Sequence, residues 1–297
     1  MNVHHGRIGD IWKHLPLAEV LSIEKPTLYW DAYAGSAEYP LTHSWERDYG
    51  VFHFLQEAGE SPDLRHSAFL KTLIGLQNGG KDLSVYPGSP ALAMTLLGRS
   101  ADYLFCDIDA RSIDSIRLVA QTKGLSEAKV RCILGDGVTS VRKTFSELPG
   151  RSLGDLFVLI DPYDPFERGK GQMHGADLFF QITSNGVKAV LWYGWDTPEM
   201  HKRVWKLIEK SFRSQSAEGS GSYWCGEIAL RQTSIRPGIH GCGILCGNLG
   251  DASVHACMRL GNGLATIYRN AKLPRGCAGA IDFNAVEPWN SQEFEVS

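Results

Sequence analysis

The sequence predicts an α/β protein built on one doubly wound, mostly parallel sheet. About five apolar, strand-like runs alternate with segments whose apolar residues recur at helical spacing. The run Leu156–Ile160 is unbroken and leads into Asp161-Pro162, as expected of a strand that is buried on both faces and ended by a proline. Two later runs, at 223–230 and 240–248, predict an antiparallel pair. Together these features indicate a Rossmann-like sheet that closes with a hairpin.

The composition is that of an ordinary globular protein. Of the 297 residues, 43% are hydrophobic and 21% are charged, so the chain can bury a large core. We interpret residues 1–297 as a single domain with a small inserted helical subdomain at 40–82. No run approaches the roughly 20 apolar residues of a membrane span, and the polar N-terminus lacks an apolar signal segment. We therefore expect a cytoplasmic protein that does not enter the membrane.

The net charge and the cysteine content limit which partners, cellular compartment and metal sites the sequence predicts. The formal net charge of −3 indicates no bulk attraction for nucleic acid, although a local basic face is compatible with it. The seven cysteines are odd in number and scattered, which favours a reducing compartment. Cys242 and Cys246 are four residues apart, but no Cys or His pair completes a zinc site, so we expect no metal.

A helix and a strand open the chain. Apolar spacing predicts a helix over 8–21, with Pro16 as a local weakness because its ring cannot donate the helical hydrogen bond. Residues 27–33 predict a strand that contains Asp31 and leads into a small-residue turn at Gly35. An acid at a strand end followed by a glycine turn is typical of the floor of a nucleotide pocket.

The insert at 40–82 interrupts this alternation and is a suitable place for substrate selection. One helix is predicted after Ser61-Pro62, where the serine would cap the helix and the proline would occupy its first turn. Alternation then resumes, and Ser89-Pro90 is expected to open a helix over 91–97 with Ser89 as its N-cap. The unpaired N–H groups at such a helix start would accept a carboxylate or phosphate.

The next two strands also end in acids. Residues 103–109 predict a strand that ends in Asp107 and Asp109, and a carboxylate there commonly receives the hydroxyls of a ribose. Residues 129–134 predict a strand that closes on Gly135-Asp136-Gly137, followed by a helix. Because parallel strands end at one edge of a sheet, these acids are expected near Asp161.

The last part of the chain is less regular. Residues 188–195 predict an aromatic-rich strand, and Thr197-Pro198 is expected to cap a long amphipathic helix. After the late antiparallel pair, residues 253–297 show no clear period, so the pattern predicts neither a structure nor a role for them.

Five collinear stretches match one known family. They are His5-Gly-x-x-Gly-Asp-x-x-Lys13-His14, Asp31-Ala-Tyr-Ala-Gly35, Tyr86-Pro-Gly-Ser-Pro90, Asp136-Gly137 and Ile160-Asp-Pro162. In these motifs the chain resembles the RlmJ-type 23S ribosomal RNA adenine-N6 methyltransferases, from residue 4 to about residue 250. A late hairpin is also characteristic of methyltransferase sheets. The resemblance implies a class I methyltransferase fold that uses S-adenosyl-L-methionine.

The resemblance also implies which residues bind the cofactor. Lys13 and His14 match a basic pair that approaches its methionine end. Asp107 matches the acid at the ribose hydroxyls, with Asp109 as the runner-up, and Asp136 matches a residue near the adenine amine. The full set of implied cofactor residues is Lys13, His14, Asp31, Gly35, Ser89, Asp107 and Asp136.

Asp161 matches the catalytic aspartate of the family. In the family motif Asp-Pro-Pro-Tyr, the carboxylate and the first proline carbonyl accept the two hydrogens of an adenine amine, while the aromatic ring stacks on the base. Pro162 is retained, but Tyr163 replaces the second proline and Asp164 stands at the usual aromatic position. Stacking would then fall to Tyr163 or to Phe166.

Two further residues are implied on the acceptor side, Tyr33 and Lys13. Tyr33 stands where the family has a histidine, so the departures from the family fall mainly on that side. Each site residue also has a purely structural alternative. His14 would be a satisfied core histidine, Ser89 a helix cap, and Asp136 and Asp161 turn residues.

Three functions stay open. The first is methylation of an adenine amine in RNA, with ribosomal RNA as the partner. The second is methylation of an amine or hydroxyl on a small molecule or peptide, which the acidic net charge and the altered acceptor motif support. The third is a nucleotide-binding protein that no longer catalyses, and the retained Asp161 and the basic pair of Lys13 and His14 argue against it.

Overall fold

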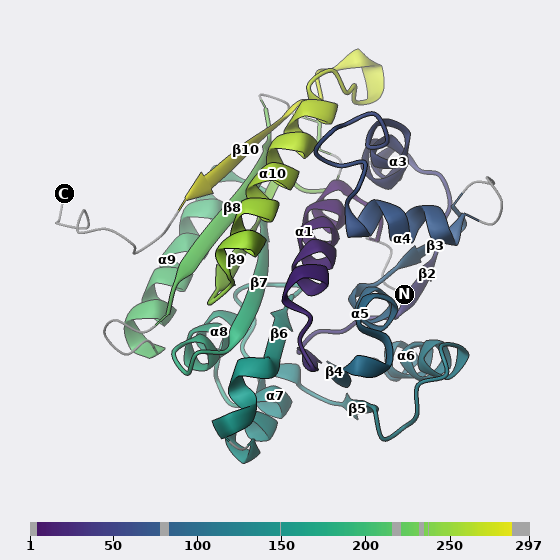
Figure 1. The fold of residues 1–297 in the computed structure, drawn as a ribbon. Coiled ribbons are helices and arrows are strands. Elements are labelled where there is room, and N and C mark those ends of the chain that lie inside the picture. The colour runs from purple at the N-terminus through teal and green to yellow at the C-terminus, as the bar shows by residue number, and fades with distance from the viewer. Residues whose placement is uncertain are drawn as a thin grey trace.

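One eight-stranded mixed sheet forms the centre of the computed structural model (Figure 1). The structure describes residues 5–77, 83–148, 150–215, 221–231, 235–236 and 238–286. The strands of the sheet are, in chain order, β1 (Leu28–Asp31), β4 (Asp102–Asp107), β5 (Val130–Leu134), β6 (Leu156–Ile160), β7 (Lys188–Trp195), β8 (Tyr223–Leu230), β9 (Gly241–Gly247) and β10 (Ile281–Val286).

The strand order of the sheet is β10-β8-β9-β7-β6-β1-β4-β5. The neighbours from β5 to β7 pair in parallel, whereas β9, β8 and β10 add antiparallel strands at the other end. The predicted doubly wound sheet with a late hairpin is therefore confirmed. In the sheet, β4 lies on one side of β1 and β6 lies on its other side, so the strand order reverses next to β1. Open α/β sheets bind their ligands at the carboxyl ends of the strands where the order reverses in this way.

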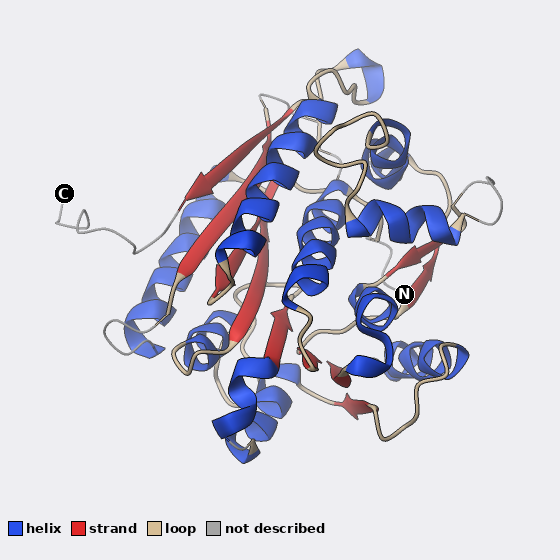
Figure 2. Cartoon of the chain, viewed as in Figure 1, coloured by secondary structure: helices blue, strands red, loops and turns tan. Residues whose placement is uncertain are grey.

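Helices cover both faces of the sheet and make three layers (Figure 2). The helices on one face are α1 (Ile8–Glu24), α4 (Ala68–Leu76), α5 (Ser89–Leu97), α6 (Ala110–Thr122) and α10 (Asp251–Tyr268). The other face carries α7 (Gly137–Glu147), α8 (Gly175–Thr183) and α9 (Pro198–Gln215). Because β6 contributes alternate side chains to both layers, all five of its residues are buried, as its apolar run predicts.

The segment at 40–82 holds more helix than the sequence predicts, and its main helix starts elsewhere. The short elements are β2 (Glu38–Pro40), α2 (Trp45–Arg47), a π turn (Asp48–Phe52), α3 (His53–Glu57) and β3 (Val85–Pro87), and β2 pairs with β3 outside the main sheet. No helix begins at Ser61-Pro62, which forms only turns. Instead α4 begins at Ala68, because the buried Ser67 side chain accepts from the Leu70 N–H at 3.3 Å.

Two parts of the chain that the sequence pattern leaves open are defined by the structure. Pro16 does not interrupt α1, which runs on to Glu24 because nearly all of its sides are buried against neighbouring elements. The C-terminal segment without a clear period contains both α10 and the edge strand β10. Two glycines in α10 obscure its helical pattern, and Gly261 is needed because an added Cβ would lie 2.3 Å from the Phe283 ring. No helix in the described part of the chain is both long and apolar enough to cross a membrane.

Close packing at the start of α7 gives a stability prediction. A Cβ added at Gly137 would lie 1.5 Å from the Ala32 carbonyl oxygen in the turn after β1. Backbone cannot move aside as a side-chain end can, so we expect Gly137→Ala to lower the free energy of unfolding by at least the ~1–3 kcal/mol typical of overpacking. Urea denaturation measures this change.

Gly75→Ala is the matched control for this substitution. Gly75 lies in the exposed part of α4, with no atom within 4 Å of its added Cβ. We expect this variant to gain roughly 0.5–1 kcal/mol, since alanine is the better helix former. Equal stability of the two variants would contradict the packing seen at Gly137.

Candidate active site

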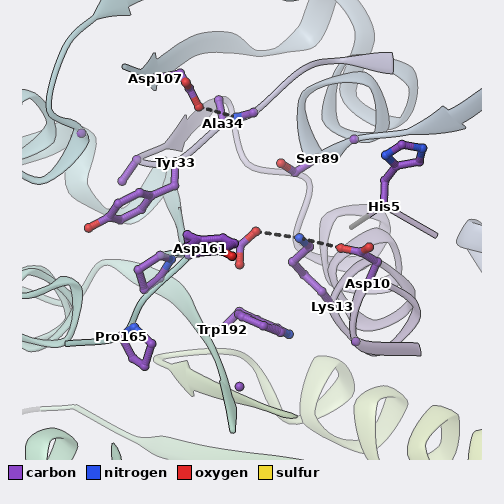
Figure 3. Close-up of a pocket in the computed structure, with 18 of the residues that line it drawn as sticks. His5, Asp10, Lys13, Tyr33, Ala34, Ser89, Asp107, Asp161, Pro165 and Trp192 are labelled. Atoms are coloured by element: carbon purple, nitrogen blue, oxygen red, sulfur yellow. Dashed lines mark hydrogen bonds and ion pairs between the residues drawn. The ribbon is translucent and has the colours of Figure 1, made fainter. Parts of the chain in front are cut away.

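A cavity of about 410 Å³ opens at the carboxyl ends of β1, β4, β5 and β6. Its walls come from the first turns of α1, the turns after these strands and the end of β7 (Figure 3). This volume lies within the range of roughly 300–1,000 Å³ found for small-molecule and cofactor sites. The cavity therefore lies where the sheet topology predicts a ligand.

An ion pair between α1 and β6 crosses the cavity. The Lys13 ammonium lies 2.6 Å from Asp161 Oδ2 and 3.1 Å from Asp10 Oδ1. Burial raises the pKa of Asp161 to about 6, against the opposing charge of Lys13. Burial alone would lower the pKa of Lys13, but the two carboxylates outweigh it and raise that pKa. Both partners are therefore charged at neutral pH.

His14 lines the cavity beside this pair but carries no charge. Its Nδ1 lies 2.8 Å from the Tyr86 hydroxyl, and its ring is buried. Burial and the neighbouring Lys13 charge hold the pKa of His14 well below its usual value. The expectation of a basic pair is thus wrong in one respect, because only Lys13 is a cation.

Asp31 lies beneath the cavity instead of in its wall. The side chain is fully buried, Oδ2 accepts from the Ser89 hydroxyl at 2.7 Å, and Oδ1 accepts from the Tyr33 N–H at 3.1 Å. Direct contact of Asp31 with a cofactor, as expected from the sequence, is therefore corrected to a supporting position. Ser89 lines the cavity, but it is the first residue of α5 and not its cap, which is Gly88.

Of the two acids after β4, the structure turns only Asp107 toward the cavity. Asp107 accepts from the Gly35 N–H at 2.8 Å, and both residues line the cavity. Asp109 instead caps α6, accepts from the Arg111 N–H at 3.0 Å and forms an ion pair with the Arg111 side chain. Sequence reasoning missed Ile108, an apolar side chain that lines the cavity and is 78% exposed. The only feature of the sequence that could have identified Ile108 is its position between Asp107 and Asp109.

Asp136 is both a helix cap and a residue of the cavity wall, so its position is compatible with the structural and with the cofactor-binding interpretation. Its carboxylate caps α7 by accepting from the Thr139 N–H at 2.8 Å, and it also lines the cavity. Gly169 closes over this carboxylate, since a Cβ at Gly169 would lie 2.8 Å from Asp136 Oδ1. Gly169 thus permits a close approach of its backbone to the Asp136 carboxylate.

The segment after Asp161 places its aromatic rings differently from the prediction. Pro162 and the 78% exposed Tyr163 line the cavity, as does Tyr33. Phe166 does not line it, because Asp164 Oδ1 accepts from the Phe166 N–H at 2.8 Å and the ring lies 4.8 Å from the Arg203 guanidinium. Phe166, which the resemblance implies on the acceptor side, is therefore not among the residues that line the cavity.

Aromatic side chains from β7 also form part of the wall. Trp192 and Trp195 line the cavity, and neither is identified by the sequence beyond the aromatic character of the strand. Asp10 is a further wall residue that was not predicted, although it falls within the N-terminal motif. Among the residues that the structure describes, no group of three or more metal-ligating side chains lies together.

The chain is similar to known proteins in sequence and in fold. Residues 24–217 match the family model described as "Ribosomal RNA large subunit methyltransferase D, RlmJ". Ribosomal RNA large subunit methyltransferase J of Haemophilus influenzae is 26% identical over 258 residues, which cover 82% of this chain and 83% of that protein. The crystal structure of protein LPL1258 from Legionella pneumophila has the same fold, with a TM-score of 0.74 at 19% identity, over 96% of this chain and 98% of that chain.

The buried Asp31 gives a prediction about stability and pH. Burial raises the pKa of Asp31 to about 7, above the value of about 4 expected in an unfolded chain. The stability that this proton contributes is complete below about pH 4 and is lost as the pH rises through about 7. Asp31→Asn removes this titration. We therefore expect the unfolding free energy of the wild type, relative to the variant, to fall by a few kcal/mol between these pH values.

Urea titrations of both proteins at several pH values measure this difference. Asp114→Asn is the control, because the Asp114 side chain is 73% exposed. A difference between the wild type and Asp31→Asn that stays constant with pH would contradict the raised pKa.

Proposed function

Because the chain belongs to the RlmJ family of ribosomal RNA large subunit methyltransferases, which depend on S-adenosylmethionine, we propose that it methylates the exocyclic amine of an adenine in ribosomal RNA. The observation that carries this acceptor is the buried Asp161 at the end of β6, followed by Pro162 and held by Lys13 at 2.6 Å. A carboxylate and a carbonyl at this position offer two acceptors to an amine with two hydrogens.

The residues around the cavity fit the cofactor. Asp107 suits the ribose hydroxyls, the exposed Ile108 offers an apolar surface for the cofactor's adenine, and Asp136 suits its amine. Ser89 and Lys13 would face the methionine end. Two carboxylates, Asp10 and Asp161, surround the single Lys13 ammonium, and this local negative charge suits a sulfonium cation. When bound, S-adenosylmethionine supplies an electrophilic methyl group.

The role of the chain in methyl transfer is to orient a weak nucleophile. The lone pair of an adenine amine is delocalised into the ring, so most of the catalysis must come from positioning. Asp161 and the Pro162 carbonyl would accept the two amine hydrogens and turn the nitrogen toward the methyl donor. The base must first leave its stack or come from a single-stranded region. Lys13 keeps Asp161 ionised, and therefore able to accept, at neutral pH.

A small-molecule or peptide acceptor is the second candidate. The net charge of −3 and the changed residues Tyr163 and Asp164 favour it, because they remove features expected of an RNA-modifying site. The helical segment at 40–82 would then select a different substrate with the same transfer chemistry.

Transfer to ribosomal RNA tests the proposed function directly. We expect label from S-adenosylmethionine to enter protein-free 23S rRNA and to appear as N6-methyladenosine after nuclease digestion and mass spectrometry. Asp161→Ala should lower kcat by about 10²- to 10³-fold, a loss comparable to that of a preorganised hydrogen-bonding group. Calorimetry should still show S-adenosylmethionine binding in this variant, weakened only by the loss of one of the two carboxylates near the sulfonium. Label entering only small molecules or peptides of a cell extract would identify the second candidate instead.

The ionisation of Asp161 gives a second test. Since the deprotonated carboxylate accepts the amine, kcat/KM should rise with pH through about 6 and level off above it. Lys13→Met removes the opposing charge, so the midpoint should move to higher pH, whereas Lys13→Arg should leave it in place. Because Lys13 also lies in the binding site, the midpoint is the informative quantity and not the absolute rate. An unmoved midpoint in Lys13→Met would disprove the role of the ion pair.

A further inference from the structure

We propose that Trp192 is the surface on which the acceptor base stacks, and that it replaces the aromatic residue of the family motif, whose position is occupied by Asp164 in this chain. This inference rests on the proposed function, because it takes a nucleobase as the acceptor. It concerns the residue that holds the base, while Asp161 and Pro162 hold the amine.

Sheet register places Trp192 beside the catalytic aspartate. Ile160, the last residue of β6, is paired with Leu191 of β7 in parallel register, and Asp161 and Trp192 are the residues that directly follow this pair. Parallel strands are about 4.8 Å apart, and paired residues project to the same face. Both side chains point toward α1, from which Lys13 reaches them. The Lys13 ammonium is 2.6 Å from Asp161 Oδ2 and 5.7 Å from the centroid of the Trp192 ring.

The Trp192 ring is held in place and is partly open to the cavity. One edge packs against two glycine positions, since added Cβ atoms at Gly9 and Gly194 would lie 3.6 and 2.9 Å from ring carbons. The side chain is only partly buried, and it lines the cavity. In Figure 3 the Lys13–Asp161 pair separates Trp192 from the proposed cofactor residues Ser89 and Asp107. A base on this ring would therefore approach the amine acceptors from the side away from the cofactor.

The other rings near the cavity are less suitable. Phe166 packs under Arg203 and lies outside the cavity wall. Trp195 is only 3% exposed, and its ring lies tilted against the His201 ring with centroids 4.1 Å apart. Tyr33 lies on the far side of Asp161 from Trp192 in Figure 3. Tyr163 lines the rim but is 78% exposed, so a base on it would be only weakly desolvated.

Stacking and amine recognition would then have separate roles in binding the acceptor base. Stacking on an aromatic face tolerates any base, so Trp192 would supply affinity, and the choice of adenine would stay with the two amine acceptors. An interaction made equally with substrate and transition state changes KM more than kcat. Loss of the Trp192 face should therefore appear mainly in KM for RNA.

Two substitutions at the same position separate stacking from packing. We measure kcat and KM for protein-free 23S rRNA with Trp192→Leu, which keeps apolar bulk, and Trp192→Phe, which keeps an aromatic face. Trp192→Leu should lose roughly ten- to hundredfold in kcat/KM, mostly through KM. Trp192→Phe should stay within about threefold of the wild type, and calorimetry should show unchanged S-adenosylmethionine binding in both. Equal losses in the two variants, or no loss in Trp192→Leu, would overturn the proposal.

A measurement on the wild type does not depend on how the variants fold. Ultraviolet cross-linking to 23S rRNA, mapped by peptide mass spectrometry, should identify Trp192. A cross-link at Tyr163 without one at Trp192, or a larger loss in Tyr163→Leu than in Trp192→Leu, would assign the stacking to Tyr163 and overturn the inference alone. A wild-type protein that transfers no methyl group to rRNA would instead overturn the proposed function, and this inference with it.

Discussion

The ion pair between Lys13 and Asp161 is the interaction on which the site depends. It joins α1 to the end of β6 across 148 positions of sequence, and both side chains are about seven-eighths buried. Removing one partner of such a pair would leave an uncompensated charge in a poorly solvated position, which typically costs about 3–5 kcal/mol. Asp10 on the same helix adds a second carboxylate, so the ammonium is held from two sides. The pair therefore fixes both the position and the charge of the Asp161 carboxylate, which we propose to be catalytic.

Two carboxyl groups shape the cavity around this pair, the buried Asp31 beneath it and the partly buried Asp107 in its wall. Asp31 holds the hydroxyl of Ser89 and the N–H of Tyr33, and so joins the start of α5 to the turn after β1. Asp107 performs the same function one strand away through the N–H of Gly35. In each case a carboxylate fixes backbone or hydroxyl donors that shape the cavity, which is why residues that do not touch a ligand still determine its binding surface.

The two sides of the cavity differ in how closely they follow the family pattern. The turns after β1, β4 and β5 keep the motif residues in the wall, whereas the segment after β6 has Tyr163 and Asp164 in place of the usual proline and aromatic residue. The Asx turn at Asp164 directs Phe166 under Arg203 and away from the cavity. The neighbouring strand β7 offers Trp192 in its place. An aromatic surface can thus be supplied from a different element while the amine acceptors stay where they are.

The sequence alone determined the alternating strands and helices of the parallel half of the sheet and their order, because the apolar run of β6 and the helical spacing of α1 and α9 encode burial directly. It also located the strand-end acids, since spacing within short motifs is local. Only the tertiary structure decided between Asp107 and Asp109, moved Asp31 beneath the cavity and removed Phe166 from it. The first two outcomes depend on hydrogen bonds that Asp107 accepts from Gly35 and that Asp31 accepts from Ser89, partners 72 and 58 positions away that no local pattern encodes. The helix α10 likewise emerged only from packing, because glycines required by close contacts, such as Gly261 against Phe283, obscure its periodicity.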